Sequence, residues 1–220
     1  MFQGVISILS QSRFPEAWLF AQKLIGGTPD KKRLALRHYA GQQRILEIGC
    51  SVGNLADAFL NCNGAEYTGI DIDEAALAVA RRRFAGRPTF SFRGDSLEAL
   101  KAEGGRWDYV LIAGVLHHVD DATARAMLES CARLCTPGGC VVVSEPVPLR
   151  PGDGAAFRFI HSIEQGQFLR ETATLMPMIK EARLTITDCE EPLIGPGITS
   201  SPKIMRFALI RAVPTGSPAA

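Results

Sequence analysis

The stretch "RILEIGCSVGNLA", residues Arg44–Ala56, decides the fold of this 220-residue chain. An apolar run that contains one acid, Glu47, leads into a turn with two glycines, Gly49 and Gly53, and then into a helical pattern. A strand that passes through a glycine turn into a helix is typical of the first unit of a nucleotide-binding α/β fold. A carboxylate beside that turn repels a pyrophosphate but suits a ligand that carries an ammonium or sulfonium cation. The stretch therefore predicts an α/β domain whose ligand is cationic where it meets the turn.

Composition narrows the class of protein further. The apolar content of 46% fits one domain with a substantial core, and the net charge of +1, with acids and bases mixed, predicts no nucleic-acid surface. No apolar run reaches the ~18 residues of a membrane span, and the first residues lack the features of a signal peptide. The six cysteines form no C-x-x-C pair and no cluster has metal-ligand spacing. We expect reduced thiols, no metal site and a cytoplasmic location.

Short apolar runs alternate with Ala- and Leu-rich segments at helical spacing along the rest of the chain. The expected strands are 44–48, 67–71, 89–93, 109–113 and 140–145, and the expected helices are 54–62, 73–84, 96–102 and 121–134. Asp71 or Asp73 and Asp121 are the expected helix N-caps, and "TPGG" (136–139) is an expected turn. This alternation predicts a doubly wound parallel sheet, in which ligands bind beyond the carboxyl ends of the strands.

Acids follow two of these strand ends. Asp71 comes about 20 residues after Gly49, the separation at which such folds place an acid on ribose hydroxyls; the alternative is that it only caps the next helix. Asp95, with Ser96 beside it, either receives an adenine amino group or caps a short helix.

The fourth and fifth strand ends supply candidate catalytic groups. Ala113 and the following glycine leave room for a ligand, and His117 and His118 present imidazoles just beyond it. Histidine titrates in the range that suits a general base; the alternative is that the pair only shapes the pocket. Glu145 either orients an acceptor or fixes the loop that follows it.

In order and spacing these motifs resemble class I S-adenosylmethionine-dependent methyltransferases over about residues 43–146. Each motif is weak alone, whereas the ordered set is specific, and Ser51 departs from the pattern because glycine is commoner there. The motifs are Glu47-x-Gly49-x-x-x-Gly53, Asp71, Gly94-Asp95, "DYVLIAGVLHHVDD" and "RLCTPGGCVVVSEP".

The resemblance implies cofactor contacts at the ends of four strands. The methionine moiety is contacted by Gly49, Ser51 and Gly53, with Glu47 near its amino group. The nucleoside is contacted by Asp71 on the ribose, by Ile72 on the adenine face, and by Asp95 with Ser96 at the adenine amino group. Ala113 offers a carbonyl near the sulfonium.

The resemblance also implies a Rossmann-like mixed sheet of seven strands with helices on both faces and the last strand antiparallel. Segments 184–190 and 204–212 are the two further strands. We expect a helical cap over 1–40, the methyltransferase domain over 41–212 with an insertion, 147–183, as a lid on the acceptor site, and a flexible tail over 213–220. Phe157, Arg158 and His161 lie in that insertion, and an apolar helix is expected within 14–24.

The implied reaction is transfer of a methyl group from S-adenosyl-L-methionine to an O or N atom of a small-molecule acceptor, such as a secondary metabolite or a glycan or lipid precursor. His118, His117 and Glu145 are the catalytic candidates, in a monomer or homodimer. Two alternatives stay open: a non-catalytic cofactor-binding relative that serves as an interaction protein, and an NAD-dependent oxidoreductase. Glu47 and the missing third glycine of the dinucleotide motif disfavour the second.

Overall fold

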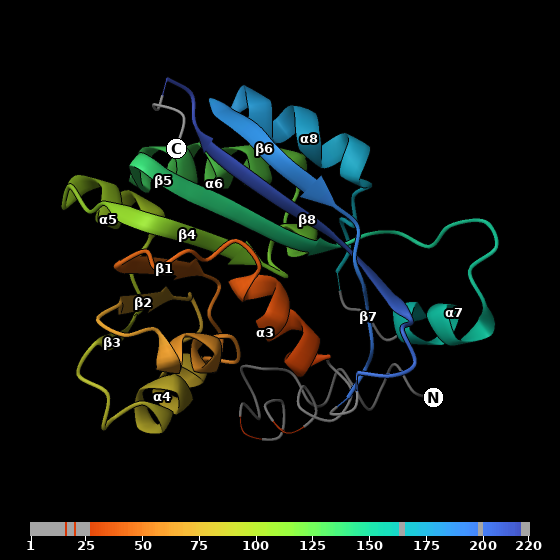
Figure 1. Ribbon diagram of the computed structural model, residues 1–220, viewed down its shortest axis with the longest axis horizontal. Coiled ribbons are helices and arrows are strands. Elements are labelled where there is room, and N and C mark those ends of the chain that lie inside the picture. Colours follow the sequence, from red (N-terminus) through yellow and green to blue (C-terminus); the bar gives the residue numbers. More distant parts are fainter. Residues whose placement is uncertain (1–15, 17–19, 21–26, 163–165, 198–199, 217–220) are drawn as a thin grey trace.

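The computed structural model describes residues 16, 20, 27–162, 166–197 and 200–216 (Figure 1). The helices are α3 (Thr28–Leu36), η1 (Ala56–Asn61), α4 (Glu74–Arg83), α5 (Leu97–Ala102), η2 (Leu116–His118), α6 (Asp121–Leu134), α7 (Ala155–Ser162) and α8 (Thr172–Glu181), where η marks a 3-10 helix. The strands are β1 (Arg44–Ile48), β2 (Glu66–Ile70), β3 (Phe90–Arg93), β4 (Trp107–Ala113), β5 (Cys135–Pro146), β6 (Leu184–Glu190), β7 (Leu193–Ile194) and β8 (Met205–Pro214).

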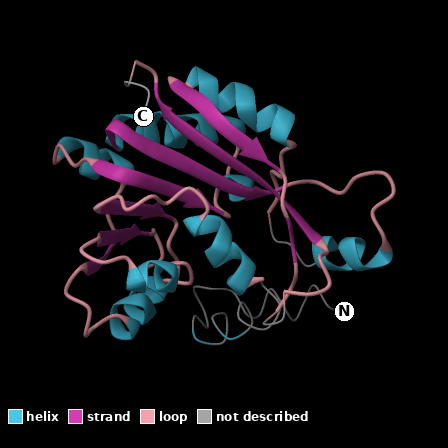
Figure 2. Cartoon of the chain, viewed as in Figure 1, coloured by secondary structure: helices cyan, strands magenta, loops and turns pink. Residues whose placement is uncertain are grey.

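The strands form one mixed sheet in the order β3-β2-β1-β4-β5-β8-β6, with β7 paired to β8 outside that path (Figure 2). The first five strands in this order are parallel, and β8 runs antiparallel to both β5 and β6. The seven-stranded Rossmann-like sheet with its last strand antiparallel is confirmed, and the short β7 is an addition to it.

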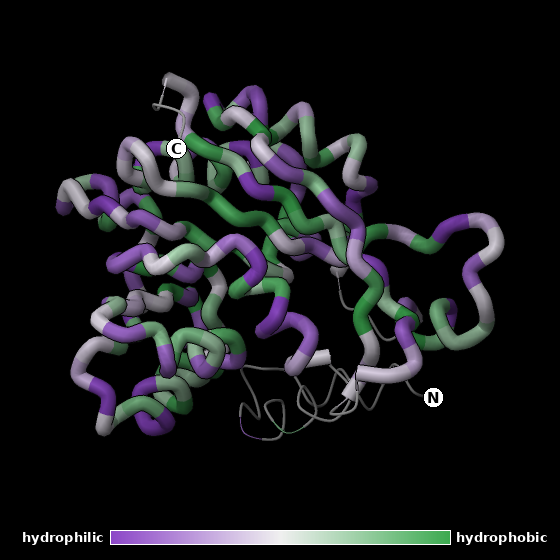
Figure 3. The backbone as a smooth tube through the Cα atoms, in the orientation of Figure 1, coloured by the Kyte–Doolittle hydropathy of each residue, from purple (hydrophilic) through white to green (hydrophobic). Residues whose placement is uncertain are grey.

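Helices cover both faces of the sheet, as expected. On one face α6 and α8 pack on the sheet through Leu128 and Ile179, and on the other α3, η1 and α4 pack through residues such as Phe59. Successive β5 residues Val141, Val142 and Val143 serve the two faces alternately, so a strand buried on both sides reads as a continuous apolar run. Figure 3 shows the hydrophobic residues concentrated along these central strands.

Several element boundaries differ from the sequence predictions for local reasons. The expected turn "TPGG" lies inside β5, because Cys135 already pairs with Trp107 of β4. Helix α6 is capped by Asp120, which accepts the N–H of Thr123, and not by Asp121. Asp73 is the cap of α4. Segment 54–62 forms a 3-10 helix of six residues instead of an α-helix.

The flexible tail expected over residues 213–220 is wrong at its first two positions. Val213 and Pro214 still belong to β8 and pair with Thr185 and Leu184 of β6. Residues 217–220 lie outside the described residues.

The insertion 147–183 divides into two parts with different roles. Helix α8 is a covering helix of the sheet, with Leu175, Met178 and Ile179 buried against the core, so the expectation of a lid is wrong for this half. Helix α7 has no buried residue and stands at the edge where β5 ends and β8 begins (Figure 1). Within the described part of the insertion, α7 and the loop before it remain as the candidate cover for an acceptor site. Of the N-terminal cap, α3 is described, whereas the apolar helix expected within 14–24 lies outside the described residues except at positions 16 and 20.

Candidate active site

The turn after β1 has the backbone geometry of a ligand cradle. Gly49, Ser51 and Gly53 all lie in the left-handed region, with φ values of 75°, 51° and 74°. A Cβ on Gly49 would come within 2.3 Å of Cγ2 of Val115. Both this steric clash and the positive φ therefore require glycine at position 49. The N–H of Gly49 donates to the carbonyl of Ile70 at 2.8 Å, which ties the turn to the end of β2.

Asp71 links this turn to the second strand. One carboxylate oxygen accepts the N–H of Ser51 at 2.7 Å, and the other accepts the N–H of Asp73 at 2.9 Å. The first bond holds the N–H of Ser51 in place at a φ of 51°, a backbone conformation that costs a non-glycine residue free energy. Each carboxylate oxygen has a second lone pair, so Asp71 keeps the capacity to accept two hydroxyl donors from a ligand. The capping role falls to Asp73, which leaves Asp71 for the turn.

The neighbouring Ile72 is 97% exposed, which leaves its apolar surface available to a flat ligand ring. Its side chain follows Asp71 directly, so a ribose on Asp71 and an adenine on Ile72 fit one nucleoside. Both nucleoside contacts stay predictions.

Glu47 lies inside the core face of β1 and not on the surface of the turn. Its carboxylate accepts a hydrogen bond from the hydroxyl of Tyr67 on β2, a partner that sequence reasoning missed. Burial raises the pKa of Glu47 from 4.5 to about 8; the Tyr67 bond lowers it and nearby Asp71 raises it. The carboxyl group is therefore a proton-binding group under the turn, and its contact with a cofactor amino group stays a prediction.

The end of β3 carries Asp95 and Ser96 in different environments. Asp95 pairs with Arg93, whose other guanidinium nitrogen contacts Glu103 at 2.8 and 2.9 Å. The cap of α5 is Ser96, whose hydroxyl accepts the N–H of Ala99 at 3.1 Å, so the alternative that Asp95 caps this helix is wrong. Asp95 keeps a half-buried carboxylate at the edge, where its adenine contact stays a prediction.

Glu145 holds the turn of residues 114–118, which follows β4. Its carboxylate accepts the N–H groups of Val115, Leu116 and His117 at 2.9, 3.0 and 3.3 Å and contacts Nδ1 of His117 at 2.7 Å. Glu145 is only 2% exposed. The expectation that it faces the crevice and orients an acceptor is therefore wrong, and so is the alternative that it fixes the loop after β5. It fixes the histidine turn, because three backbone donors converge on that position.

The two histidines of that turn separate by burial. His117 is buried on Glu145, whereas His118 is exposed, with the two ring centres 4.0 Å apart. Half-buried Ala113, at the end of β4, leads into this turn, and the N–H of Gly114 donates to Ser144 of β5 at 2.9 Å. Of the pair, His118 is the imidazole that a bound acceptor can reach from solvent.

Arg170 also holds this turn. No pattern in the sequence indicated its role. This buried guanidinium donates to the carbonyls of Leu116 and Val119 at 2.6 and 2.8 Å and to a carboxylate oxygen of Asp121 at 2.8 Å. About 50 residues separate it from its partners, so no local spacing signals the contact.

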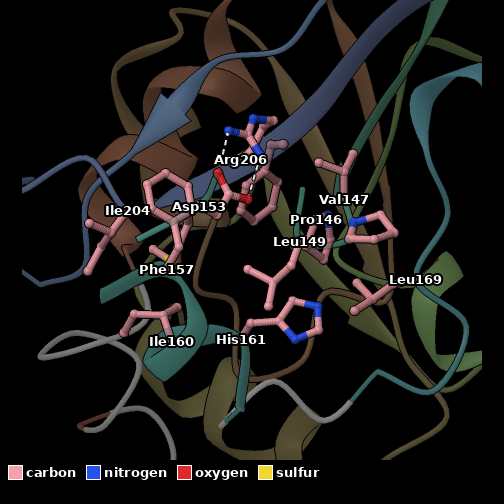
Figure 4. A pocket seen from close by; sticks show the side chains of 13 residues that line it. Pro146, Val147, Leu149, Asp153, Phe157, Ile160, His161, Leu169, Ile204 and Arg206 are labelled. Carbon is pink, nitrogen blue, oxygen red and sulfur yellow. Dashed lines mark hydrogen bonds and ion pairs between the residues drawn. The ribbon is translucent and has the colours of Figure 1, made fainter. Parts of the chain in front are cut away.

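An open pocket lies between the end of β5, the start of β8 and α7, with about 420 Å³ of empty space that includes solvent at its mouth (Figure 4). Its walls are mainly apolar and include Val147, Leu149, Phe157, Ile160, Leu169 and Ile204. His161 also lines it, as the expected position over the mouth suggests, whereas exposed Arg158 donates to the carbonyl of Asp153 at 2.6 Å.

The predicted site residues therefore meet at one edge of the sheet. Backbone bonds join neighbouring strand ends: Asp71 N–H to Arg93 at 3.3 Å, Gly49 N–H to Ile70, and Gly114 N–H to Ser144. Among the described residues no group of three His, Cys, Asp or Glu side chains suits a metal ion, and no helix is long and apolar enough to cross a bilayer. All six cysteines are free thiols.

Comparison with known proteins agrees with this geometry. Residues 46–141 match the family model of a methyltransferase domain. Ubiquinone biosynthesis O-methyltransferase of Paracidovorax citrulli (strain AAC00-1) is 40% identical over 105 residues, which are 46% of this chain and 43% of the relative. The protein of the same description from Albidiferax ferrireducens is 40% identical over 108 residues, 48% of this chain and 41% of that one. The match thus spans less than half the length of these curated relatives.

Solved structures with the same fold cover more of the chain. The N-methyltransferase NodS from Bradyrhizobium japonicum WM9, in complex with S-adenosyl-L-homocysteine, has a TM-score of 0.65 at 16% identity and covers 96% of both chains. Magnesium protoporphyrin IX methyltransferase from Synechocystis PCC 6803, with bound SAM, has a TM-score of 0.61 at 18% identity and covers 86% of this chain and 79% of that one.

The fold is that of these solved methyltransferases, and residues 46–141, which carry most of the ordered strand-end motifs, match a methyltransferase domain.

Proposed function

We propose that this protein transfers a methyl group from S-adenosyl-L-methionine to an oxygen or nitrogen atom of a small-molecule acceptor. The observation that carries the proposal is the cradle after β1: three left-handed residues, a Cβ-free Gly49, and Asp71 at the next strand end. A ligand that lies closely on this turn and offers hydroxyls to Asp71 is a nucleoside with a compact cationic substituent. S-Adenosyl-L-methionine fits that description, and the solved methyltransferases with this fold hold it or its demethylated product.

When bound, S-adenosyl-L-methionine would supply a methyl carbon on a positive sulfonium, to which an acceptor lone pair would bond in line as the carbon–sulfur bond breaks and S-adenosyl-L-homocysteine leaves. The chain has three tasks around that step. The turn 49–53 and Asp71 fix the donor, the rigid turn 114–118 borders the reacting atoms, and exposed His118 takes the proton that a hydroxyl or amine acceptor loses. Glu145 and Arg170 act as positioning residues, because each holds the backbone that carries His118.

The acceptor is proposed as a small molecule in the cytoplasm, methylated by a monomer or homodimer with no nucleic-acid partner. The near-neutral charge and the free thiols support this reading. The curated relatives favour an oxygen acceptor, because both are described as O-methyltransferases. Methylation at nitrogen is the second candidate, favoured by the fold likeness to an N-methyltransferase.

Two measurements test the proposal. Calorimetry should show S-adenosyl-L-methionine binding in the micromolar range, about −8 kcal/mol, with no comparable binding of NAD. Incubation with methyl-labelled cofactor and a pool of small hydroxyl and amine compounds should then transfer label to an acceptor. Tight NAD binding without S-adenosyl-L-methionine binding would establish the oxidoreductase alternative, and cofactor binding without transfer to any acceptor would favour the non-catalytic one.

A further inference from the structure

The pocket beside α7 lies outside the cofactor cradle and is built from other segments. Its walls come from the loop after β5, from α7 and from the first residues of β8 (Figure 4). Phe157 and Ile160 of α7 face Val147 and Leu149 of the loop across the opening. The space between these walls, about 420 Å³ with the open solvent at its mouth included, is a concave and mainly apolar surface of the kind that binds small molecules.

The charges that border this pocket neutralise one another. Arg206 contacts the two carboxylate oxygens of Asp153 at 3.0 and 3.1 Å, and the N–H of Arg150 donates to the same carboxylate at 2.8 Å. The guanidinium also lies 5.3 Å from the ring centre of Phe157. The pair with Arg206 lowers the pKa of Asp153 to about 2, so the carboxylate stays ionised and paired at neutral pH. A charged ligand group would lose its hydration there without finding an uncompensated counter-charge.

One polar atom in the pocket wall has no partner of its own. Nε2 of His161 is buried and makes no hydrogen bond to any of the described residues. Figure 4 places its ring between Leu149 and Leu169, on the side of α7 that borders the pocket. A buried imidazole nitrogen without a partner costs free energy, which a ligand hydroxyl recovers by bonding to it.

The pocket adjoins the histidine turn on two sides. It begins at Pro146, the residue after Glu145, whose carboxylate holds that turn. Leu169 on its other wall follows Phe168, whose N–H donates to the carbonyl of His117 at 2.9 Å. A ligand in the pocket is therefore next to the turn that carries His118.

We propose that this pocket binds the body of the methyl acceptor, and that the acceptor is a neutral, apolar ring compound with a hydroxyl that bonds to Nε2 of His161. The identification of the ligand as the acceptor rests on the proposed function. The pocket's preference for neutral, hydroxylated rings rests only on its own residues and can be measured without turnover.

The test uses 1-naphthol, naphthalene and 1-naphthyl phosphate as probes for the full chain, with binding followed by fluorescence or calorimetry. The wild-type protein should bind 1-naphthol, and 1-naphthyl phosphate at least about tenfold more weakly. Ile160→Trp should weaken 1-naphthol binding about tenfold or more because the indole fills the pocket. Phe159→Trp is the matched control on the same helix: Phe159 is 54% exposed and does not line the pocket, so binding should not change.

His161→Phe isolates the hydrogen bond. It should weaken 1-naphthol about fivefold to tenfold while changing naphthalene less than twofold, and His161→Gln should restore part of the 1-naphthol affinity. The affinity for S-adenosyl-L-methionine, measured in parallel, should not change in any variant. If the wild-type protein does not bind S-adenosyl-L-methionine, the proposed function is wrong, whereas the result for the pocket is unaffected. No 1-naphthol binding, equal binding of the phosphate, or equal effects of Ile160→Trp and Phe159→Trp would overturn the proposal.

Discussion

The cofactor cradle and the α7 pocket lie at one edge of the same sheet but are built by different means. The cradle is mainly backbone: N–H and carbonyl groups of the turn 49–53 and of β2 define it, and the side chains of Asp71 and Arg83 bond to the turn. The pocket is made of side chains from 146–153, from 157–161 with Leu169, and from 204–207, and the ion pair of Arg206 and Asp153 joins two of these segments. A backbone cradle has little freedom to adjust, so a single added carbon should disturb it more than a larger change in the pocket. The following predictions test that difference.

The largest effect is expected from Gly49→Ala. The new Cβ would meet Cγ2 of Val115 at 2.3 Å, at a φ of 75°. Left-handed strain and overpacking together should cost roughly 2–5 kcal/mol, divided between folding stability and S-adenosyl-L-methionine affinity. Chemical denaturation and calorimetry measure the two parts.

The double variant Gly49→Ala with Val115→Ala separates the two causes. It should recover the part due to overpacking and keep the part due to φ. Gly86→Ala is the control, because no atom lies within 4 Å of the position where its Cβ would be. Equal losses at Gly49 and Gly86 would contradict a cradle that depends on close backbone approach.

Glu47→Gln should remove a pH dependence of stability that the cradle imposes on the wild type. The folded-state pKa of Glu47 is about 8, raised by burial from 4.5, so between these values the folded protein holds a proton that the unfolded chain releases. Wild-type stability should therefore fall as pH rises from about 5 to 8, by on the order of 3 kcal/mol at pH 7, and the glutamine variant should lose this fall.

Three groups bear on that titration: Tyr67, which donates to the carboxylate, and Asp71 and the thiol of Cys50, which lie near it. The amide oxygen of glutamine also accepts from Tyr67, so the variant keeps the contact and changes only the charge. Denaturant unfolding at several pH values measures the effect. Parallel pH profiles for the two proteins would show that Glu47 ionises normally under the turn.

The contrast between cradle and pocket also explains what the sequence could reveal. The turn 49–53, Asp71 and the parallel strands were predictable, because each depends on residues within one β-α unit or on a simple apolar run. The pocket partners Asp153 and Arg206 are 53 residues apart, and Arg170 meets the histidine turn from a distance of about 50. Such contacts depend on how the chain packs, and no local spacing encodes them.

Glu145 shows the same limit from the other side. Its place at the end of β5 was correct, but the sequence did not reveal that three backbone N–H groups of a separate turn converge on it. In a sequence, a carboxylate at the end of a strand looks the same whether its side chain contacts a ligand or a buried turn. The insertion behaved similarly: the apolar residues of α7 and α8 look alike in sequence, yet only α8 is buried on the sheet.

His118 lies where the two regions meet, and its replacement should affect turnover alone. With a hydroxyl acceptor in hand, His118→Ala should lower turnover about 10²-fold while the affinity for S-adenosyl-L-methionine changes little, because the ring is exposed and holds no part of the cradle. His38→Ala, at an imidazole that lies 3.9 Å from Asp188 of β6, should leave turnover unchanged. Turnover that matches the wild type in the His118 variant would reduce this residue to pocket wall.

The smallest effect is expected at Asp71, where the cradle depends on a side chain. Asp71→Ala should weaken S-adenosyl-L-methionine binding by roughly 1–3 kcal/mol, because two ribose hydroxyls lose a charged acceptor and Ser51 loses the partner of its N–H. Asp73→Ala is a matched control two residues away. It removes the carboxylate that caps α4 by accepting the N–H groups of Ala75 and Ala76. This change should cost about 1 kcal/mol of stability without changing cofactor affinity. Calorimetry with S-adenosyl-L-methionine and with free methionine distinguishes the sources, since loss of the ribose contact affects only the nucleoside ligand. If Asp73→Ala weakens the cofactor as much as Asp71→Ala does, the acid after β2 acts by shaping the loop, and the nucleoside contact proposed for Asp71 is wrong.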